Sequence, residues 1–409
     1  MTIYRSVGYL QKQRYVPRQI LSPPAKGLAL IIIIPCFAEL TLLRTLASLE
    51  AADPIEEPIE VLIVLNQGTH HGSDIQSINL QTKQEFDTWN HQRRLTYHIL
   101  DMRELPKKHA GVGLARKIGM DEAIDRFEQA GTEDGVIVNL DADSQVSSGY
   151  LRMISGLTHD SSAQAWSLRF EHPIDGNEFS PSVYQGIVLY ELFLRYYIQG
   201  LRWAAYPMAF HTIGSSMAVR ASAYQAQGGM NRRKAGEDFY FLHKFSALGK
   251  LKEAHSAWII PSPRRSDKVP FGTGKAIGDY LDRGDGTWNT YPPSVFNLLR
   301  ELVDLVPSFY HGWPSLSPIV EAFLMQEGLP AHLLEMRKHS KTQRTFQRRF
   351  YTWLDPLKVL KLIHFLRDQH TGDIPLMEAA GKLLAFLKHP AGESSREMLQ
   401  IYRTIQTPA

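Results

Sequence analysis

The sequence is short of cysteine and of long hydrophobic runs. Cys36 is the only cysteine among 409 residues, which excludes an intrachain disulfide and a metal site built from several cysteines. The first residues contain no apolar stretch typical of a secretory signal. The longest strongly apolar run, Leu28 to Pro35, is far shorter than the about 20 residues of a transmembrane helix. We therefore expect a cytoplasmic protein without a membrane-spanning helix.

An excess of charge of one sign is also missing. The chain has 45 lysines and arginines against 42 acidic residues, a net charge of +3. This near balance gives no global field of the kind that marks nucleic-acid binders, and we expect no nucleic-acid partner. The hydrophobic content of 44% is ordinary for a globular protein and supplies enough core for two domains, or for one large domain with an appendage.

The most informative stretch present is GVIVNLDADS, residues 135–144. Its apolar run predicts a central parallel strand, buried on both faces. Asp141 and Asp143 follow at i and i+2, a spacing that places both carboxylates on one face. Two carboxylates that close repel each other unless a cation lies between them, and Mg²⁺ or Mn²⁺ suits oxygen ligands. The structural alternative is a solvated turn that caps the next helix.

Further strands and helices alternate along the chain and predict an α/β fold. Apolar runs predict strands over 28–34, 61–65, 95–100, 165–170, 217–219 and 257–260, and helical periodicity connects them over 42–49, 75–89, 111–131 and 184–203. Strand–helix–strand units of this kind favour parallel pairing. From about residue 294 the periodicity is helical throughout. We therefore predict an arm or linker over 1–27, a mixed, mostly parallel sheet flanked by helices over 28–275, and a helical region over 276–409.

Three polar segments lie outside these apolar runs. Gly111 and Gly113 open a helix, but Arg116 occupies the position of the third glycine of a dinucleotide fingerprint. Arg116 and Lys117 at this helix N-terminus favour phosphate, and a solvated basic turn is the alternative. Glu237-Asp238 begins another helix, where the helix dipole favours acidic residues for structural reasons alone. The loop 261–275 combines four cations with two glycines, which is typical of a mobile lid over a phosphorylated ligand and of an ordinary exposed loop.

A basic stretch lies in the C-terminal region. Residues 337–349 carry six lysines and arginines and no acid, next to Phe350, Tyr351 and Trp353. A basic helix with neighbouring aromatics could touch an anionic membrane surface, which would place the protein peripherally at the inner face of the membrane. A solvated basic helix face is the alternative.

Taken in order, six segments resemble the family 2 glycosyltransferases, which have the GT-A fold. The segments are IIIIPCFAE, VLIVLNQG, GVGLARKIGM, VNLDADS, GSSMAVR and GEDFYFLHKF, and the resemblance covers about residues 28–275. The resemblance implies a Rossmann-like GT-A sheet and a nucleotide-sugar donor with Mn²⁺ or Mg²⁺ as cofactor. Residues 276–409 match nothing in the family.

The resemblance also implies roles for individual residues. Asp141 and Asp143 match the DXD motif, which holds the metal on the donor diphosphate, and His255 is the candidate for a third metal ligand, followed by His211. Arg116 matches a basic position near the pyrophosphate. Glu237 and Asp238 match the ED motif of the catalytic base, and Asp238 is the predicted base.

The remaining roles concern the donor and acceptor surfaces. Pro35 and Glu39 match the first-strand motif beside the nucleoside. Asn66 stands where the family commonly has an aspartate that contacts the base. Residues 214–216 are expected to line the acceptor side, and Arg264, Arg265 and Lys268 to belong to a flexible loop over the donor.

The implied activity is the inverting transfer of one sugar, a hexosyl transfer, to an acceptor hydroxyl. The acceptor would be a glycan, a lipid-linked compound or a small molecule, and a chain without a membrane span favours a non-processive enzyme. One alternative is a nucleotidyltransferase that acts on a sugar phosphate and releases pyrophosphate. The other is a non-catalytic binding protein that retains the fold.

Overall fold

The computed structural model describes residues 4–406 and divides them into two compact units. The sheet unit contains the chain up to Pro173, Thr212–Ser262 and Lys268–Gly272, and the helical unit contains Ile174–His211, Pro263–Asp267 and the chain from Thr273 onward. The predicted ranges 28–275 and 276–409 differ from this division. Residues 174–211 lie inside the first predicted range, yet they group with the C-terminal helices.

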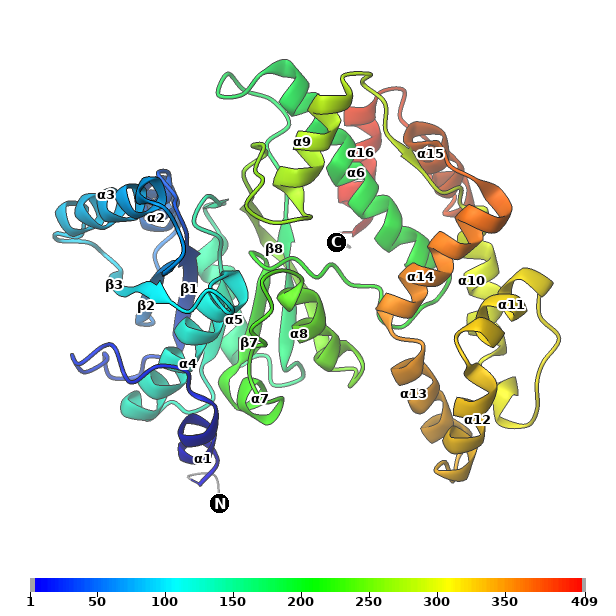
Figure 1. Cartoon of the computed structure of the whole chain (residues 1–409), viewed down its shortest axis with the longest axis horizontal. Helices are drawn as coiled ribbons and strands as arrows, with labels where there is room; N and C mark the ends of the chain where they lie inside the picture. Colours follow the sequence, from blue (N-terminus) through cyan, green and yellow to red (C-terminus); the bar gives the residue numbers. More distant parts are fainter. Residues whose placement is uncertain (1–3, 407–409) are drawn as a thin grey trace. The chain divides into compact units, whose positions relative to one another are not determined.

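The sheet unit is built on eight strands in the order β3-β2-β1-β4-β7-β6-β8-β5. Strands β3, β2, β1 and β4 pair in parallel, while β7 is antiparallel to both β4 and β6. The predicted mixed α/β class with a C-terminal helical region is confirmed (Figure 1). The strands are β1 (Leu30–Cys36), β2 (Ile59–Gly68), β3 (Thr96–Leu105), β4 (Val136–Asn139), β5 (Gln145–Val146), β6 (Ala165–Phe170), β7 (Met217–Arg220) and β8 (Leu251–Ile260).

The central strands are fully buried, and most of their side chains are apolar on both faces. Every residue of β1 and β2 is buried, as expected for parallel strands covered by helices. Gly119 of α4 lets that helix approach closely, since a Cβ there would lie 2.6 Å from the Ile33 side chain. The helices of this unit are α1 (Tyr4–Gln13), α2 (Leu42–Ala51), α3 (Ser73–Trp89), α4 (Val112–Ala130), α5 (Tyr150–His159), α7 (Ala221–Ala226) and α8 (Glu237–Ser246).

The N-terminal segment is bound to helix α4. Arg14 and Arg18 both pair with Asp125, at 2.6 and 2.7 Å, and the Tyr9 hydroxyl donates to Asp121 at 2.9 Å. Burial alone would raise the pKa of Asp125, but hydrogen bonds from Arg18 and Arg14 hold it below its ordinary value. Residues 9–18 therefore form an arm that is attached to α4. The sequence alone did not distinguish an arm from a linker.

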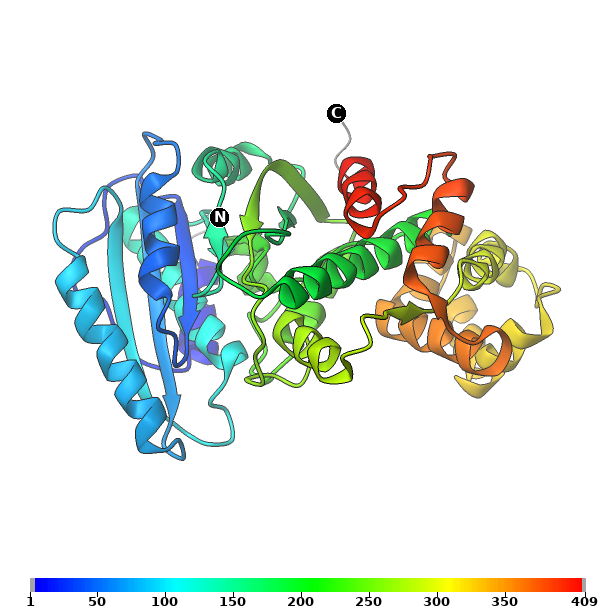
Figure 2. The same ribbon diagram turned by 90° about the horizontal axis from the view of Figure 1, so that it is seen from above.

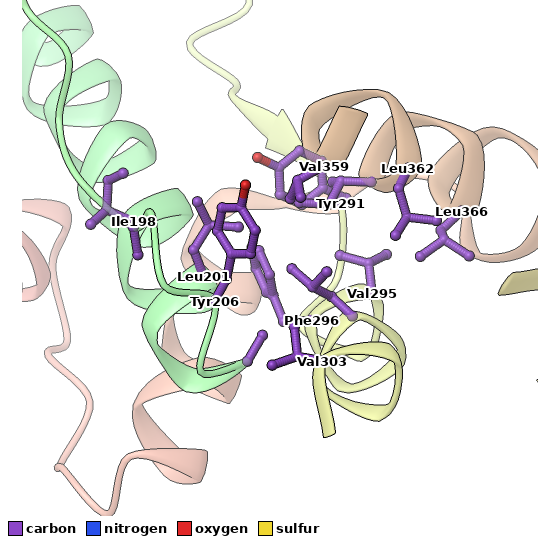
Figure 3. Close-up of a cluster of buried hydrophobic side chains, with 14 of the residues drawn as sticks. Ile198, Leu201, Tyr206, Tyr291, Val295, Phe296, Val303, Val359, Leu362 and Leu366 are labelled. Atoms are coloured by element: carbon purple, nitrogen blue, oxygen red, sulfur yellow. The ribbon is translucent and has the colours of Figure 1, made fainter. Parts of the chain in front are cut away.

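The helical unit has its own apolar core. Ile198 and Leu201 of α6 (Pro181–Trp203) belong to one buried cluster with Phe296 of α10 (Ser294–Leu305) and Leu362 of α14 (Pro356–Leu366) (Figure 3). The unit also contains α9 (Thr273–Arg283), α11 (Pro318–Gln326), α12 (Leu329–Lys338), α13 (Gln343–Trp353), α15 (Leu376–Phe386), α16 (Ser395–Gln406), the short helices η1 (Ser308–Tyr310) and η2 (Arg367–Thr371), and the strand pair β9 (Asn289–Thr290) and β10 (Ile374–Pro375).

Helices α6 and α16 lie side by side (Figure 2). Buried charged side chains connect the two helices. Glu191 of α6 accepts hydrogen bonds from Arg195 at 2.8 Å and from Arg403 of α16 at 2.7 Å. All three side chains are buried, so each charge depends on its partners. This network fixes α16 to a helix that precedes it by about two hundred residues in the chain.

The prediction of a single basic, membrane-facing helix over residues 337–349 is wrong. Residues 337–349 are divided between the end of α12 and most of α13. Arg337 donates to the carbonyl oxygen of Phe309 at 2.6 Å, while Phe350 and Trp353 are buried in the core. These two aromatic side chains therefore do not provide an exposed membrane-contacting surface. Within residues 4–406, no helix has both the length and the apolar composition needed to cross a bilayer.

Candidate functional site

The candidate site forms where the parallel strands end. Strands β2, β1 and β4 run in the same direction, so the residues after them meet at one edge of the sheet, the usual ligand edge of open α/β sheets. Asn66 lies near the end of β2, Glu39 follows β1 and Asp141 follows β4. Thr45 of α2 holds the loop after β4 in place by donating to the Ala142 carbonyl oxygen at 2.8 Å.

Arg116 joins the two predicted acidic pairs. Its Nη2 lies 2.6 Å from Asp141 Oδ1, and its Nη1 forms an ion pair with Glu237. Arg116 and Glu237 are buried, at 3% and 1% exposure, whereas the Asp141 side chain is 40% exposed. Burial alone would lower the pKa of Arg116, but the carboxylates around it raise that pKa, so the guanidinium stays charged.

The two residues of the acidic pair on α8 therefore have different surroundings. Glu237 is buried against Arg116, while Asp238 is half-buried and accepts a hydrogen bond from the Phe239 backbone N–H at 2.7 Å. Burial raises the pKa of both carboxyl groups, and Arg116 opposes that effect. Only Asp238 combines partial exposure with a raised pKa, two properties expected of a proton acceptor in an active site.

Glycine at position 214 lets Arg116 take this place. A Cβ on Gly214 would lie 2.4 Å from both terminal nitrogens of the guanidinium. Gly214, Ser215 and Ser216 are all buried. Gly214 therefore lies against the Arg116 guanidinium, and the acceptor-lining role expected for residues 214–216 stays a prediction.

Replacing Gly214 with alanine is expected to displace Arg116 and to lower stability by about 1–3 kcal/mol, the usual cost of forcing an extra methyl group into a packed site. The measurement is denaturant unfolding. Gly156→Ala is the matched control, because Gly156 lies in α5 with open space around the added Cβ and a helical Gly→Ala change stabilises. Equal stability of the Gly214 variant and wild type would contradict the packing described here.

The predicted nucleoside side is assembled around Glu39. Its Oε1 accepts from the Thr41 hydroxyl at 2.7 Å, and Lys268 Nζ lies 3.4 Å from Oε2. Lys268 also donates to the carbonyl oxygens of Phe37 and Ala38, at 2.8 and 2.9 Å. The structure thus brings together Glu39 and Lys268, which are far apart in sequence. Pro35 lies within β1, shortly before Glu39 in the chain.

The other predicted loop cations lie in the helical unit. Arg265 forms a bidentate pair with Asp282, at 2.6 and 3.0 Å, and Arg264 belongs to the same unit. The loop is therefore divided, with Lys268 in the sheet unit and both arginines outside it. The sequence showed only a basic composition, which does not distinguish these partners.

A third metal ligand is not gathered with the two aspartates. Within the described part of the chain, no group of three or more His, Cys, Asp or Glu side chains is placed to hold a metal ion. His255 lies on β8 with Nε2 3.7 Å from Glu253, and His211 lies in the helical unit, 3.2 Å from Gln406 Oε1. Burial lowers the pKa of His211 to about 3.

Sequence reasoning missed Asn79 of α3, which organises the backbone around Ala38 and Gln67 on the predicted nucleoside side. This fully buried side chain accepts from the Ala38 backbone N–H at 2.9 Å and donates to the Gln67 side chain at 3.0 Å. Ala38 has φ of +44°, a strained conformation for a residue with a Cβ, and Asn79 stabilises it. Asn66 in turn donates to the Cys36 carbonyl oxygen at 2.9 Å. An asparagine on the buried face of a predicted helix was the available signal.

Comparison with known proteins gives only distant similarity. The sequence matches no protein-family model and no curated protein. Among solved structures, TarS of S. aureus in complex with UDP-GlcNAc shows 13% identity and a TM-score of 0.39, over 92% of this chain and 90% of that one. The mannosyltransferase PcManGT of Pyrobaculum calidifontis, in complex with GDP-Man and Mn²⁺, shows 13% identity and a TM-score of 0.36, over 86% and 93%.

A third similar structure is GalNAc-T7 with UDP, GalNAc and Mn²⁺, with 15% identity and a TM-score of 0.36, over 63% of this chain and 48% of that one. All three TM-scores lie below 0.5. The fold class therefore rests on the strand order and pairing described above.

Proposed function

We propose that this protein transfers a sugar from a nucleotide-sugar donor to an acceptor hydroxyl, with a divalent metal ion and with inversion at the anomeric carbon. The observation that carries the proposal is Arg116, which ties Asp141 at the end of β4 to Glu237 at the start of α8. One buried cation thereby holds a candidate metal-binding loop and a candidate base at the same edge of the sheet. The six motifs that resemble family 2 glycosyltransferases with the GT-A fold supply the reaction class.

In this mechanism Asp238 acts as the general base. Its carboxylate takes the proton of the acceptor hydroxyl as that oxygen forms a bond to the anomeric carbon. The bond from that carbon to the donor diphosphate breaks, and the nucleoside diphosphate leaves with the electron pair. Glu237 stays in its buried ion pair with Arg116 and positions the first turn of α8. The leaving diphosphate would lie beside Asp141 and Asp143.

The residues present fit a hard divalent cation. Two carboxylates after a buried strand suit Mg²⁺ or Mn²⁺ when the remaining ligands come from phosphate oxygens and water, and Asp141 is exposed enough to contact a ligand. When bound, such an ion supplies positive charge against the diphosphate. Asp141 and Asp143 are the residues that would hold it, without help from His255 in this structure.

The nucleoside would lie beside Pro35, Glu39 and Asn66. Lys268, which contacts Glu39 and the backbone after β1, would border this part of the donor site. Arg264 and Arg265 are left out of the proposed site, since Arg265 is already paired with Asp282.

Replacing Asp143 with alanine is expected to abolish the metal-dependent stabilisation by donor. A ligand that binds only the folded state stabilises it by about 2.7 kcal/mol at one hundred times its Kd, so thermal unfolding with a panel of nucleotide sugars, with and without Mn²⁺, measures donor binding directly. Wild type should gain stability with one class of nucleotide, and the variant should not. Stabilisation of both proteins to the same extent would contradict the assignment of Asp143.

The products distinguish sugar transfer from nucleotidyl transfer. A glycosyltransferase releases a nucleoside diphosphate, whereas a nucleotidyltransferase that acts on a sugar phosphate releases pyrophosphate. Chromatography of the nucleotide products after incubation with donor and acceptor separates the two. Release of pyrophosphate from a nucleoside triphosphate and a sugar phosphate would reject the proposed reaction.

A further inference from the structure

Two short basic segments lie next to each other in the sheet unit. Lys107, Lys108 and His109 precede helix α4, and Arg232, Arg233 and Lys234 precede helix α8. We call these six residues the basic patch. The chain that follows the first segment contacts the second, because a Cβ on Gly113 would lie 2.2 Å from the Arg233 carbonyl oxygen and a Cβ on Gly111 would lie 3.3 Å from Lys234. His109 and Arg232 both lie against the ring of Tyr15.

The cations of the basic patch have no acidic partners. Arg232 lies over the ring of Tyr15 at 5.6 Å and Arg233 over that of Tyr240 at 3.9 Å. Across residues 4–406, no ion pair to a carboxylate involves any lysine or arginine of the patch. Neighbouring Arg232, Lys108 and Lys234 also lower the pKa of His109, after desolvation of its ring.

Several partly exposed cations of this protein do have acidic partners, whereas exposed lysines of the helical unit such as Lys338 and Lys341 have none among the described residues. Lys83 pairs with Asp87 at 2.6 Å, Arg103 with Asp101 at 2.6 Å, and Lys275 with Asp279. The whole chain carries a net charge of only +3. An unpaired cluster of cations in a chain that is otherwise balanced creates a local positive potential, which attracts anions.

The basic patch is continuous with the segment that holds the candidate base. The side chain of Asn231 donates to the Glu237 carbonyl oxygen at 3.0 Å, and Arg233 stacks on Tyr240, which follows Asp238 by two residues. Charges at this place would act on a molecule whose hydroxyl reaches Asp238. The donor is proposed to lie toward Asp141 and Glu39, and Lys234 is also near that side, since after desolvation and His70 its charge lowers the pKa of His71, whose ring lies 4.8 Å from that of Phe37.

We propose that the basic patch binds negatively charged groups of the acceptor, phosphate or carboxylate, next to the hydroxyl that receives the sugar. This inference rests on the proposed function and names its acceptor class as an anionic compound. Arginine and lysine suit such groups, since they offer charged hydrogen-bond donors. Binding should weaken with salt, because the patch is exposed.

The first test uses short-chain sodium polyphosphate as the probe, in calorimetric titrations with and without saturating donor nucleotide. The variant is Arg232→Gln/Arg233→Gln/Lys234→Gln. The control, Lys338→Gln/Lys341→Gln/Lys361→Gln, removes the same charge from exposed lysines of the helical unit. We expect wild type and control to bind the probe alike, with donor present or absent, and the patch variant to bind at least tenfold more weakly.

Three results of this test would overturn the inference. One is equal binding of the probe by the patch variant and wild type. Another is displacement of the probe by the donor nucleotide, which would make the patch part of the donor site. Tighter binding of a single-stranded oligonucleotide or of phosphatidylglycerol vesicles than of polyphosphate would also reject an acceptor role. Donor binding is measured separately, so its absence in wild type would reject the proposed function, and that result is distinguishable from a failure of the patch to bind the probe.

A second test compares acceptors that differ only by a phosphate group. Wild type is expected to show a lower KM for the phosphorylated acceptor, and the patch variant should lose that advantage while its KM for the donor stays unchanged. Equal use of both acceptors by wild type would overturn the inference even if sugar transfer itself is confirmed.

Discussion

Replacing Asp238 with asparagine is expected to lower kcat by about 10²–10⁴-fold, the usual contribution of a positioned general base. Asparagine keeps the shape of the side chain but cannot accept the proton. Donor binding should be unchanged, because the donor is proposed to contact Asp141 and Asp143 and not α8. The measurement is a steady-state assay of sugar transfer, with donor affinity taken from the thermal-unfolding panel.

The pH dependence provides a second readout of the same residue. Burial raises the pKa of Asp238 above its ordinary value, against the opposing charge of Arg116. Because the base must be ionised, kcat should fall as the pH drops through this raised pKa, so the acid limb of wild type should lie above the ordinary aspartate range. The residual kcat of Asp238→Asn should not fall in this pH range.

The thermal stability of Asp238→Asn shows whether the ionised Asp238 carboxylate stabilises or destabilises the folded protein. A carboxyl group whose pKa is raised by folding resists ionisation in the folded state, so its contribution to stability is lost as the pH rises above the unfolded value. Asp238→Asn should therefore unfold at the same temperature as wild type, or at a higher one, at pH 7. Asp87→Asn, in a surface ion pair, is the control and should retain full activity. Wild-type transfer rates in Asp238→Asn would reject the base assignment.

Replacing Arg116 with methionine is expected to cost about 3–5 kcal/mol, the usual effect of removing one partner of a buried ion pair. Glu237 would be left buried without its cation, and Asp141 would lose its 2.6 Å contact. The measurement is denaturant unfolding at pH 7, together with the donor panel. Because a protonated Glu237 needs no cation, part of the loss should disappear at low pH.

A double variant separates stability from function at this position. Arg116→Met/Glu237→Leu removes both charges and should recover much of the stability, since apolar replacement of a whole buried pair is often neutral or stabilising. Sugar transfer should stay low, because the link between the loop after β4 and the start of α8 is gone. A double variant that is stable and fully active would show that Arg116 does not position the site.

Much of the fold could be predicted because its signals are local. The apolar runs that form β1, β2 and β4 exclude water on both faces, and no other arrangement buries them as well. The glycine after α4 adopts a left-handed conformation, with φ of +72° at Gly131, as its position at a helix end implies. The unit to which α6 belongs could not be predicted in this way, because an aromatic-rich helix is equally suited to cover a sheet or to join a helical core.

The candidate site was only partly predictable, because only some of its signals are local in the sequence. Asp141, Asp143 and Asp238 follow buried strands or begin a helix, so their types and positions could be read along the chain. The partners of Arg116 and Lys268 could not, since the contacts join residues up to 231 positions apart. Composition made Arg265 and Lys268 look alike, and the structure pairs one with Asp282 and the other with Glu39.

The sequence by itself determined the strands, the helices and the acidic residues available for chemistry, because hydrophobic periodicity and backbone preferences act between near neighbours. The tertiary structure decided which charges meet. It buried Glu237 beneath Arg116 and left Asp238 partly exposed, and it gathered two basic segments that are separated by more than one hundred residues into one patch. Electrostatic energies depend on distance and burial, and neither quantity exists until the chain has folded.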